Sequence, residues 1–119
     1  NIFGITAAEA AYREGEEWLD DLMGYLKTNV DHVKNFLADN IPEITISPAE
    51  ATYMLWLDCR KLGFSDPELR KLLIEKAGLG FVDGPTFGRG GEGFQRMNIA
   101  CPRSTLNQAL DRLITALKF

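Results

Sequence analysis

The sequence predicts an α+β domain in which helices pack on one face of a small sheet of mixed or antiparallel strands. Three observations lead to this fold class. A long amphipathic segment precedes the first strand, short β-rich runs occur in two pairs around a capped helical segment, and the last segment carries leucines at helical spacing. With 119 residues the chain is long enough to bury one core. We therefore predict a single domain over residues 1–119.

Two helices are expected before the first strand. In residues 6–13, Thr6 and Glu9 have the spacing of a capping box, which predicts a short helix. Residues 16–38 predict a long helix with acidic residues at its start, where the helix dipole favours negative charge. Its length is roughly 35 Å at the usual helical rise. One small sheet cannot cover such a helix, so we expect part of it to contact something else.

The remaining elements follow in order. Residues 43–47 and 52–58 predict two strands, and Ser65 with Glu68 forms a second capping box that opens a helix ending near Gly78. Residues 79–82 and 94–100 predict two further strands, and a last helix begins near Ser104. The predicted order is helix, helix, strand, strand, helix, strand, strand, helix.

Composition narrows the classes of function. A formal net charge of -4 and a pI near 5.0 argue against a nucleic-acid partner, which needs a basic face. No apolar run approaches the roughly 20 residues of a membrane span, so no membrane partner is expected. Cys59, Cys101 and His32 have no metal-ligand spacing. We expect no bound metal and two reduced cysteines in a cytoplasmic protein.

A glycine-rich stretch, GRGGEGF at residues 88–94, matches the Gly-x-Gly-x-x-Gly pattern of dinucleotide-binding loops. That pattern binds a pyrophosphate when it lies between a strand and the N-terminus of a helix. Here a strand follows Gly93, so the dinucleotide interpretation is rejected. We predict instead a loop between two strands, whose glycines permit positive φ and which can border a ligand site.

The strand after this loop carries an arginine of interest. Alternation along residues 94–100 places Arg96 and Asn98 on one face, and Met97 and Ile99 on the face that packs against the helices. A guanidinium can bind a carboxylate through two parallel hydrogen bonds. A solvent-facing or salt-bridged arginine is the structural alternative for Arg96.

Three stretches resemble a known family: GEEWLDDLMGYLKTNVDHVKNFL, PEITISPAEATYMLWLDCRKLG and above all GPTFGRGGEGFQRMNIACPRSTLNQALDRL. They are similar to the carboxy-terminal small domain of fold-type I pyridoxal-phosphate enzymes, within the class I/II aminotransferases. The resemblance is strongest to the cystathionine β-lyase, or C–S β-lyase, branch. It covers nearly the whole chain in the same order.

The resemblance implies roles for particular residues. Arg96 matches the arginine that binds the α-carboxylate of the amino-acid substrate, and Asn98 is a further candidate for substrate binding. Gly84, Phe87 and Gly88 match the loop that borders the family's cleft. Residues 1–14 match the segment that connects the two domains of these enzymes.

The family's cofactor, pyridoxal 5'-phosphate, is held by a lysine and by phosphate-binding groups of the larger preceding domain. No segment here resembles the one that carries that lysine. We expect the six lysines to be solvated charges rather than nucleophiles: Lys27, Lys34, Lys61, Lys71, Lys76 and Lys118. The chain is therefore expected to be part of a larger enzyme, and to be inactive and free of cofactor on its own.

The expected activity of the larger enzyme is elimination from cystathionine or a related cysteine derivative, giving pyruvate, ammonia and a thiol, in a homodimer. A small domain of an aminotransferase is the alternative within the family. A free-standing α+β binding domain without catalysis is the alternative of another class. The two classes differ at Ile2, Phe3 and Ile5, which a free-standing domain would bury and a domain lacking its partner would expose.

Overall fold

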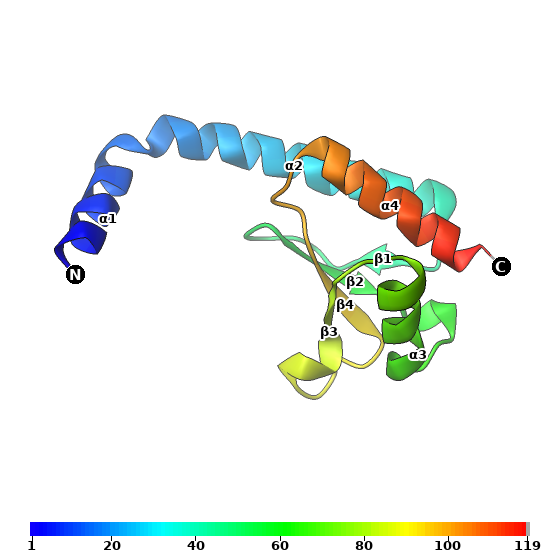
Figure 1. Cartoon of the computed structure of the whole chain (residues 1–119). Coiled ribbons are helices and arrows are strands. Elements are labelled where there is room, and N and C mark those ends of the chain that lie inside the picture. The colour runs from blue at the N-terminus through cyan, green and yellow to red at the C-terminus, as the bar shows by residue number, and fades with distance from the viewer. Residues whose placement is uncertain (119) are drawn as a thin grey trace.

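A computed structural model describes residues 1–118 and contains four antiparallel strands in the order β1-β2-β4-β3 (Figure 1). The strands are β1 (Thr45–Ile46), β2 (Met54–Asp58), β3 (Val82–Asp83) and β4 (Phe94–Asn98). The α-helices are α1 (Ile2–Glu14), α2 (Glu16–Asn40), α3 (Asp66–Lys71) and α4 (Arg103–Leu117). The predicted fold class and order of elements are confirmed, and the sheet is antiparallel throughout the described residues.

Three short helical segments complete the fold. The 3₁₀ turn η1 (Arg60–Leu62) follows β2, and the 3₁₀ turn η3 (Gly84–Phe87) follows β3. The segment η2 (Leu72–Lys76) continues α3 as a π-helix, which the sequence pattern did not predict. Gly78 follows it with φ +64°, a conformation in which glycine is favoured. This confirms Gly78 as the end of that helical segment.

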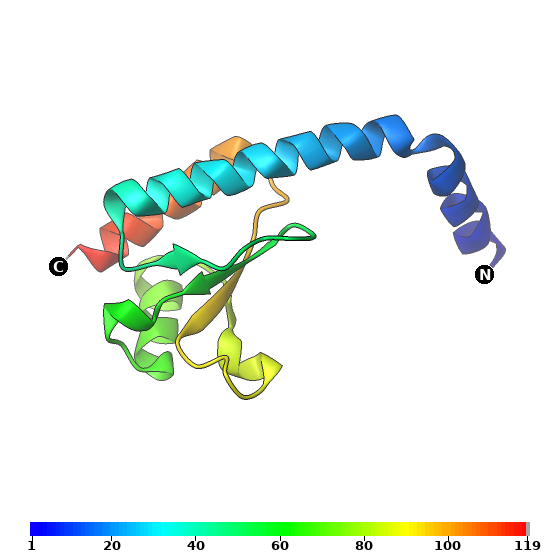
Figure 2. The ribbon, with the colours of Figure 1, turned by 180° about the vertical axis from the view of Figure 1, so that it is seen from behind.

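The core lies on one face of the sheet. Leu55 and Leu57 of β2 and Met97 of β4 are all at most 2% exposed. Helices α2 and α4 run side by side over this face, as both ribbon views show (Figures 1 and 2). They contribute the buried residues Leu26, Val33, Leu37, Leu106, Leu110 and Leu113. Helical stripes of this kind drive the packing because each removes apolar surface from water.

The capping box at Ser65 is confirmed. The backbone N–H and the hydroxyl of Ser65 both donate to Oε2 of Glu68, at 2.9 and 2.6 Å. These hydrogen bonds favour the carboxylate and lower the pKa of Glu68. Pro67 lies in the first turn of α3. A backbone N–H there has no acceptor within the helix, so the missing N–H of proline costs no hydrogen bond.

The capping box expected at Thr6 and Glu9 is wrong. Helix α1 begins at Ile2, because the side chain of Asn1 caps it by accepting from the N–H of Gly4 at 3.4 Å. Thr6 lies inside the helix and donates its hydroxyl to the carbonyl of Ile2 at 3.0 Å. Glu9 instead forms an ion pair with Arg13 at 2.9 Å.

All four strands are shorter than the sequence predicted: β2 and β4 each lack two of the predicted residues, and β1 and β3 have only two residues each. Within 43–47 only Thr45 and Ile46 pair with β2, and Pro48 follows without an N–H to continue the ladder. Within 79–82 only Val82 belongs to β3, which extends to Asp83 and pairs with β4. The sheet is therefore built around β2 and β4, which pair over five residues.

Helix α1 and the first half of α2 extend away from the sheet (Figures 1 and 2). Helix α1 contains no buried residue, and the buried residues of α2 begin at Leu26. Large apolar side chains are exposed along this region: Ile2, Phe3, Ile5, Tyr12, Trp18, Leu19 and Met23. This confirms that the sheet covers only part of the long helix. No helix in residues 1–118 is both long and apolar enough to span a bilayer.

Candidate functional site

The face of the sheet opposite the core carries the predicted arginine. In β4, Gln95 and Met97 are buried against the helices, whereas Phe94 and Arg96 are half-buried on the other side. The register pairs Trp56 of β2 with Arg96, and Asp58 with Phe94. Antiparallel partners point to the same side of a sheet, so these four side chains form one surface. The predicted alternation along the strand is confirmed.

Arg96 lies over an aromatic ring. Its guanidinium carbon is 4.7 Å from the centroid of the Phe87 ring, a cation–π distance. Among the described residues, no hydrogen bond or ion pair engages its guanidinium. The salt-bridged alternative for Arg96 therefore does not hold within residues 1–118. Its N–H groups are available to a ligand.

Three aromatic rings support this surface. Trp56 stacks on Phe94 with centroids 5.4 Å apart and an interplanar angle of 13°. The same indole meets the ring of Phe87 edge-on, at 5.5 Å and 80°. Both geometries are favourable arrangements of aromatic quadrupoles. We call Trp56, Phe87 and Phe94 the aromatic platform.

A second arginine on this surface, Arg60, is paired with the carboxylate of Asp58. Arg60 lies over Phe94 at 4.8 Å and donates to both oxygens of Asp58, at 2.9 and 2.7 Å. This bidentate pair is the strong form of an arginine–carboxylate contact. The hydrogen bonds from Arg60 lower the pKa of Asp58, so the pair stays charged at neutral pH.

The glycine loop has the positive φ values that the sequence predicted. Gly88, Gly90 and Gly93 have φ values of +111°, +90° and +75°. The N–H of Gly93 donates to Oδ1 of Asp66 at 2.8 Å, which ties the end of the loop to α3. A strand follows Gly93, as predicted, and this confirms the absence of the strand–loop–helix context that a dinucleotide loop needs.

Gly84 and Gly91 hold turn η3 against the glycine loop. The backbone of each lies so close to the other that neither has space for a Cβ atom. Sequence reasoning singled out Gly84 but missed Gly91. The adjacent pair Gly90–Gly91 was the available signal, because two successive glycines often mark a close backbone approach.

The other predicted residues lie around Arg96. Phe87 is directly against it, and Gly84 and Gly88 bound the turn that carries Phe87. Asn98 is exposed at the end of β4 and accepts a hydrogen bond from the N–H of Ala100 at 2.8 Å. This contact gives Asn98 a local role in ending the strand. Its role in substrate binding stays a prediction.

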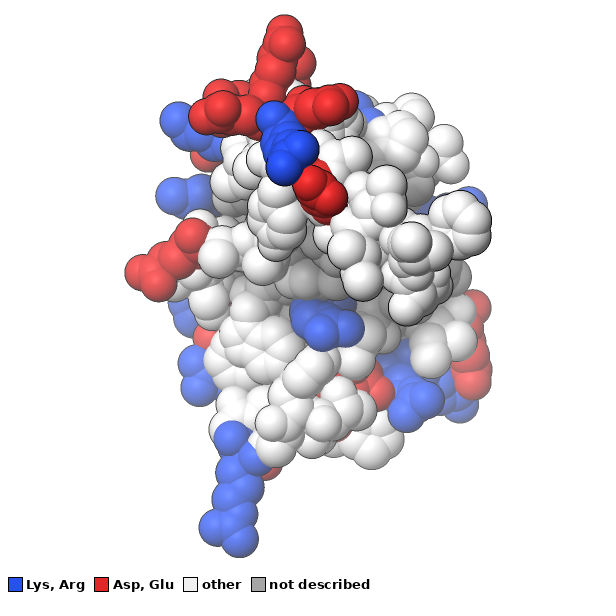
Figure 3. Space-filling view, turned by 90° about the vertical axis from the view of Figure 1, so that its left-hand side faces the viewer, with Lys and Arg blue, Asp and Glu red and all other residues white. Residues whose placement is uncertain are grey.

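Charge is distributed unevenly over the molecule. Figure 3 views the left-hand side of Figure 1, and acidic side chains gather at its top, near the junction of α1 and α2. The acidic residues of this junction include Glu14, Glu16, Glu17 and Asp20. The middle of the same view is mostly uncharged.

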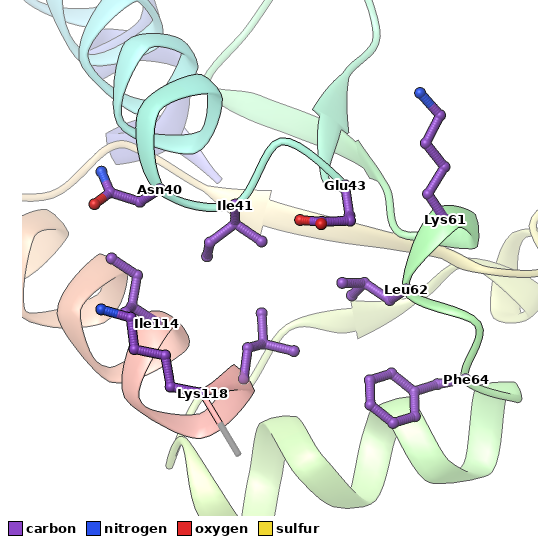
Figure 4. Close-up of a pocket in the computed structure, with 9 residues that line it drawn as sticks. Asn40, Ile41, Glu43, Lys61, Leu62, Phe64, Ile114 and Lys118 are labelled. Carbon is purple, nitrogen blue, oxygen red and sulfur yellow. The ribbon is translucent and has the colours of Figure 1, made fainter.

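A separate cavity of about 360 Å³ lies between the ends of α2 and α4 and turn η1. Figure 4 shows the carboxylate of Glu43 directed toward Ile41, and the side chain of Lys61 directed away from the cavity. None of the predicted site residues lines it. We therefore place the candidate site at Arg96 and not here.

All six lysines of the chain are exposed. None belongs to the surface around Arg96, where the cationic groups are arginines. The described residues of this surface suit a carboxylate ligand. They do not offer the lysine that a covalently held pyridoxal phosphate requires.

Comparison with known proteins agrees with this geometry. The chain is 38% identical over 117 residues to cystathionine β-lyase PatB of Bacillus subtilis, covering 98% of this chain and 30% of that protein. The pyridoxal-phosphate-bound structure of a putative aminotransferase from Clostridium difficile 630 superposes with a TM-score of 0.96 at 42% identity, over 99% of this chain and 30% of the other. Cystalysin of Treponema denticola, whose structure contains pyridoxal 5'-phosphate, gives 0.93 at 39% identity, over 98% and 29%.

The fold and these similarities define the chain as the small domain of a pyridoxal-phosphate enzyme. Within that class it belongs to the class I/II aminotransferase family, on the branch of the cystathionine β-lyases. More distant relatives, at 28% identity, are aminotransferases. The chain spans about 30% of the length of the curated relatives it matches. No family model matches it.

Proposed function

We propose that the protein to which this domain belongs is a pyridoxal-phosphate-dependent C–S β-lyase acting on cystathionine or a related S-substituted cysteine. The reaction removes the α-proton, breaks the Cβ–S bond and releases a thiol. Water then converts the remaining three-carbon unit into pyruvate and ammonia. The observation that carries the proposal is Arg96, a half-buried arginine without a carboxylate partner on a domain homologous to cystathionine β-lyases.

Arg96 would bind the α-carboxylate of the substrate. The guanidinium presents a planar fork of N–H donors, and a carboxylate accepts two of them in parallel. The half-buried position of Arg96 beside the ring of Phe87 strengthens this attraction, because charges are screened less there than in bulk water. Binding at one end of the substrate fixes the orientation of its α-carbon.

Pyridoxal phosphate, when bound, acts as an electron sink for negative charge at the substrate's α-carbon. The residues of this chain do not supply a buried lysine for the cofactor, since all six lysines are exposed. We infer that the cofactor is held by the large domain. This domain would supply the substrate's carboxylate site and would exclude water when it closes.

The exposed apolar side chains of α1 and α2 support a large partner domain. Ile2, Phe3 and Ile5 are 74%, 83% and 68% exposed. A free-standing domain would bury such residues, so their exposure favours the interpretation that a partner covers them. We include the connecting role of residues 1–14 and a homodimer of the whole enzyme in the proposal. We also include a cytoplasmic location, which two free cysteines support.

The test uses the full-length protein. We expect a yellow protein that loses its visible absorption band on treatment with borohydride, and that releases pyruvate and ammonia from cystathionine without any added 2-oxo acid. A colourless protein, or one without pyruvate release from any S-substituted cysteine, would refute the proposal. The chain produced alone is expected to be colourless and inactive.

An aminotransferase is the second candidate, because a solved structure at 42% identity and homologues at 28% identity carry that name. The same assay separates the two reactions. An aminotransferase requires a 2-oxo acid as acceptor and leaves the sulfur group on its product. The elimination requires no acceptor and releases a thiol.

A further inference from the structure

We propose that Phe87 is a positioning residue for Arg96, and that it makes the site selective for carboxylate ligands. The inference rests on the proposed function, in which Arg96 binds the substrate's carboxylate. Phe87 would hold the guanidinium plane against its ring so that the N–H edge faces the ligand.

The exposure of Phe87 is the first observation. The side chain is 52% exposed, and it belongs to the turn η3 rather than to the helical core. Its ring contacts Trp56 at 5.5 Å and Arg96 at 4.7 Å. Phe87 therefore does little to fill the core, and its contacts are with the site.

The geometry of a cation over a ring explains what this contact does. The ring face attracts the guanidinium through its quadrupole but accepts no conventional hydrogen bond from the in-plane N–H groups. The donors at the edge of Arg96 thus stay available while rotation of its long side chain is restricted. Restricting the side chain before binding lowers the entropic cost of forming two hydrogen bonds to a carboxylate.

The same surface contains an internal example of the complete arrangement. Arg60 lies 4.8 Å from the centroid of Phe94, and its N–H edge binds both oxygens of Asp58. Arg96 lies 4.7 Å from the centroid of Phe87, and no carboxylate of residues 1–118 engages it. The two arginine–phenylalanine pairs are joined by Trp56, which contacts both rings. The pair at Arg96 is thus equivalent to the pair at Arg60, with the place of Asp58 left for a ligand.

The backbone fixes the ring that makes this contact. Turn η3 begins at Gly84, whose backbone is packed against Gly91. At its other end the N–H of Gly88 donates to the carbonyl of Pro85 at 3.2 Å. Trp56 meets Phe87 from β2. The ring of Phe87 is thus positioned by the turn that carries it and by its contact with Trp56, so it presents a fixed surface to Arg96.

The experiment compares Phe87→Leu, Phe87→Tyr and Arg96→Ala in the full-length enzyme. We expect Phe87→Leu to raise KM for an S-substituted cysteine roughly two- to tenfold, the range of a lost cation–π contact, with kcat changed less. Phe87→Tyr keeps the ring and should restore KM. The probe for selectivity is the matching substrate with an α-carboxamide, whose KM should not differ between Phe87→Leu and the wild type.

Each outcome has one meaning. If Arg96→Ala raises KM but Phe87→Leu does not, the role of Phe87 is refuted and the proposed function stands. If Arg96→Ala leaves KM unchanged, the assignment of Arg96 fails and the inference falls with it. An equal rise in KM for the carboxylate and the carboxamide would show that Phe87 only shapes the site, and this also refutes the inference. Thermal unfolding of each variant checks folding, and Phe87→Met replaces Phe87→Leu if the latter unfolds.

Discussion

Gly84 and Gly91 pack backbone against backbone, and neither position has space for a side chain. Gly84 opens turn η3, which carries Phe87, and Gly91 lies in the middle of the glycine loop. Both residues are buried although the loop around them is exposed. This contact joins the start of turn η3 to the middle of the glycine loop and sets the position of the turn beside Arg96.

Replacing Gly84 with alanine is therefore expected to destabilise the protein. The added Cβ would meet the backbone carbonyl of Gly91, and backbone cannot move aside as a flexible side chain can. Overpacking of this kind costs about 1–3 kcal/mol in the free energy of unfolding. Chemical denaturation of the full-length protein measures the loss. Gly80→Ala is the matched control, since no atom lies within 4 Å of its added Cβ, and an equal loss there would contradict the argument.

Replacing Arg96 with alanine is expected to weaken substrate binding. Hydrogen bonds between charged groups contribute enough that KM should rise roughly ten- to a hundredfold, whereas the visible absorption of the cofactor should not change. Steady-state kinetics with several S-substituted cysteines measure the effect. Arg89→Ala removes an exposed arginine of the glycine loop and serves as the control for net charge. Unchanged kinetics for Arg96→Ala would remove it from the site.

The sequence was informative where local signals decide the structure. The capping box at Ser65, the alternation along β4 and the positive φ of the glycines all follow from local physical chemistry. The start of α1 was misjudged because Thr6 and Asn1 offer competing caps, and the side chain of Asn1 makes the hydrogen bond.

Contacts between distant segments were less accessible to sequence reasoning. The contact of Phe87 with Arg96 depends on the approach of Gly84 to Gly91, and the sequence indicates a close approach at Gly90–Gly91 without indicating its partner. The pair of Arg60 and Asp58 is local in sequence, but its place beside Phe94 depends on the register of β2 and β4. Arg96 itself was found because a lone arginine in mid-strand is unusual, and its role followed from the family resemblance.

The ion pair of Asp58 and Arg60 predicts a pH-dependent contribution to stability. Hydrogen bonds from Arg60 lower the pKa of Asp58 in the folded protein. The contribution is therefore present above the ordinary aspartate range, near about pH 4, and is lost as the pH falls through the lower pKa of the folded state. Asp58→Asn should reduce stability at pH 7 by about 1 kcal/mol or less, because the pair is partly solvated. Thermal unfolding at pH 7 and at low pH should show this difference shrinking in acid. A difference that grows in acid would contradict the assignment.

Cys59 is expected to be unreactive toward alkylating reagents in the native protein. Burial raises the pKa of the Cys59 thiol to about 12, and its side chain is 4% exposed. The nucleophilic thiolate is therefore nearly absent at Cys59 below pH 9. Iodoacetamide at pH 8 should leave Cys59 unmodified in the native protein and should modify it after denaturation. Peptide mass spectrometry measures both states, and rapid native labelling of Cys59 would contradict its buried position.

The exposed apolar surface of α2 gives a test for the large domain. Leu19 is 51% exposed here, and Ile74 of η2 is 50% exposed, so the two positions are matched in size and exposure. If the large domain covers the first half of α2, a charge at Leu19 is buried in the full-length protein and costs about 1–3 kcal/mol. A charge at Ile74, which is on a different part of the domain, stays solvated. We expect Leu19→Glu to lower the stability of the full-length protein well below that of Ile74→Glu, as measured by chemical denaturation. Equal stability of the two variants would mean that the first half of α2 is exposed in the whole protein. This result would favour the interpretation of a free-standing domain.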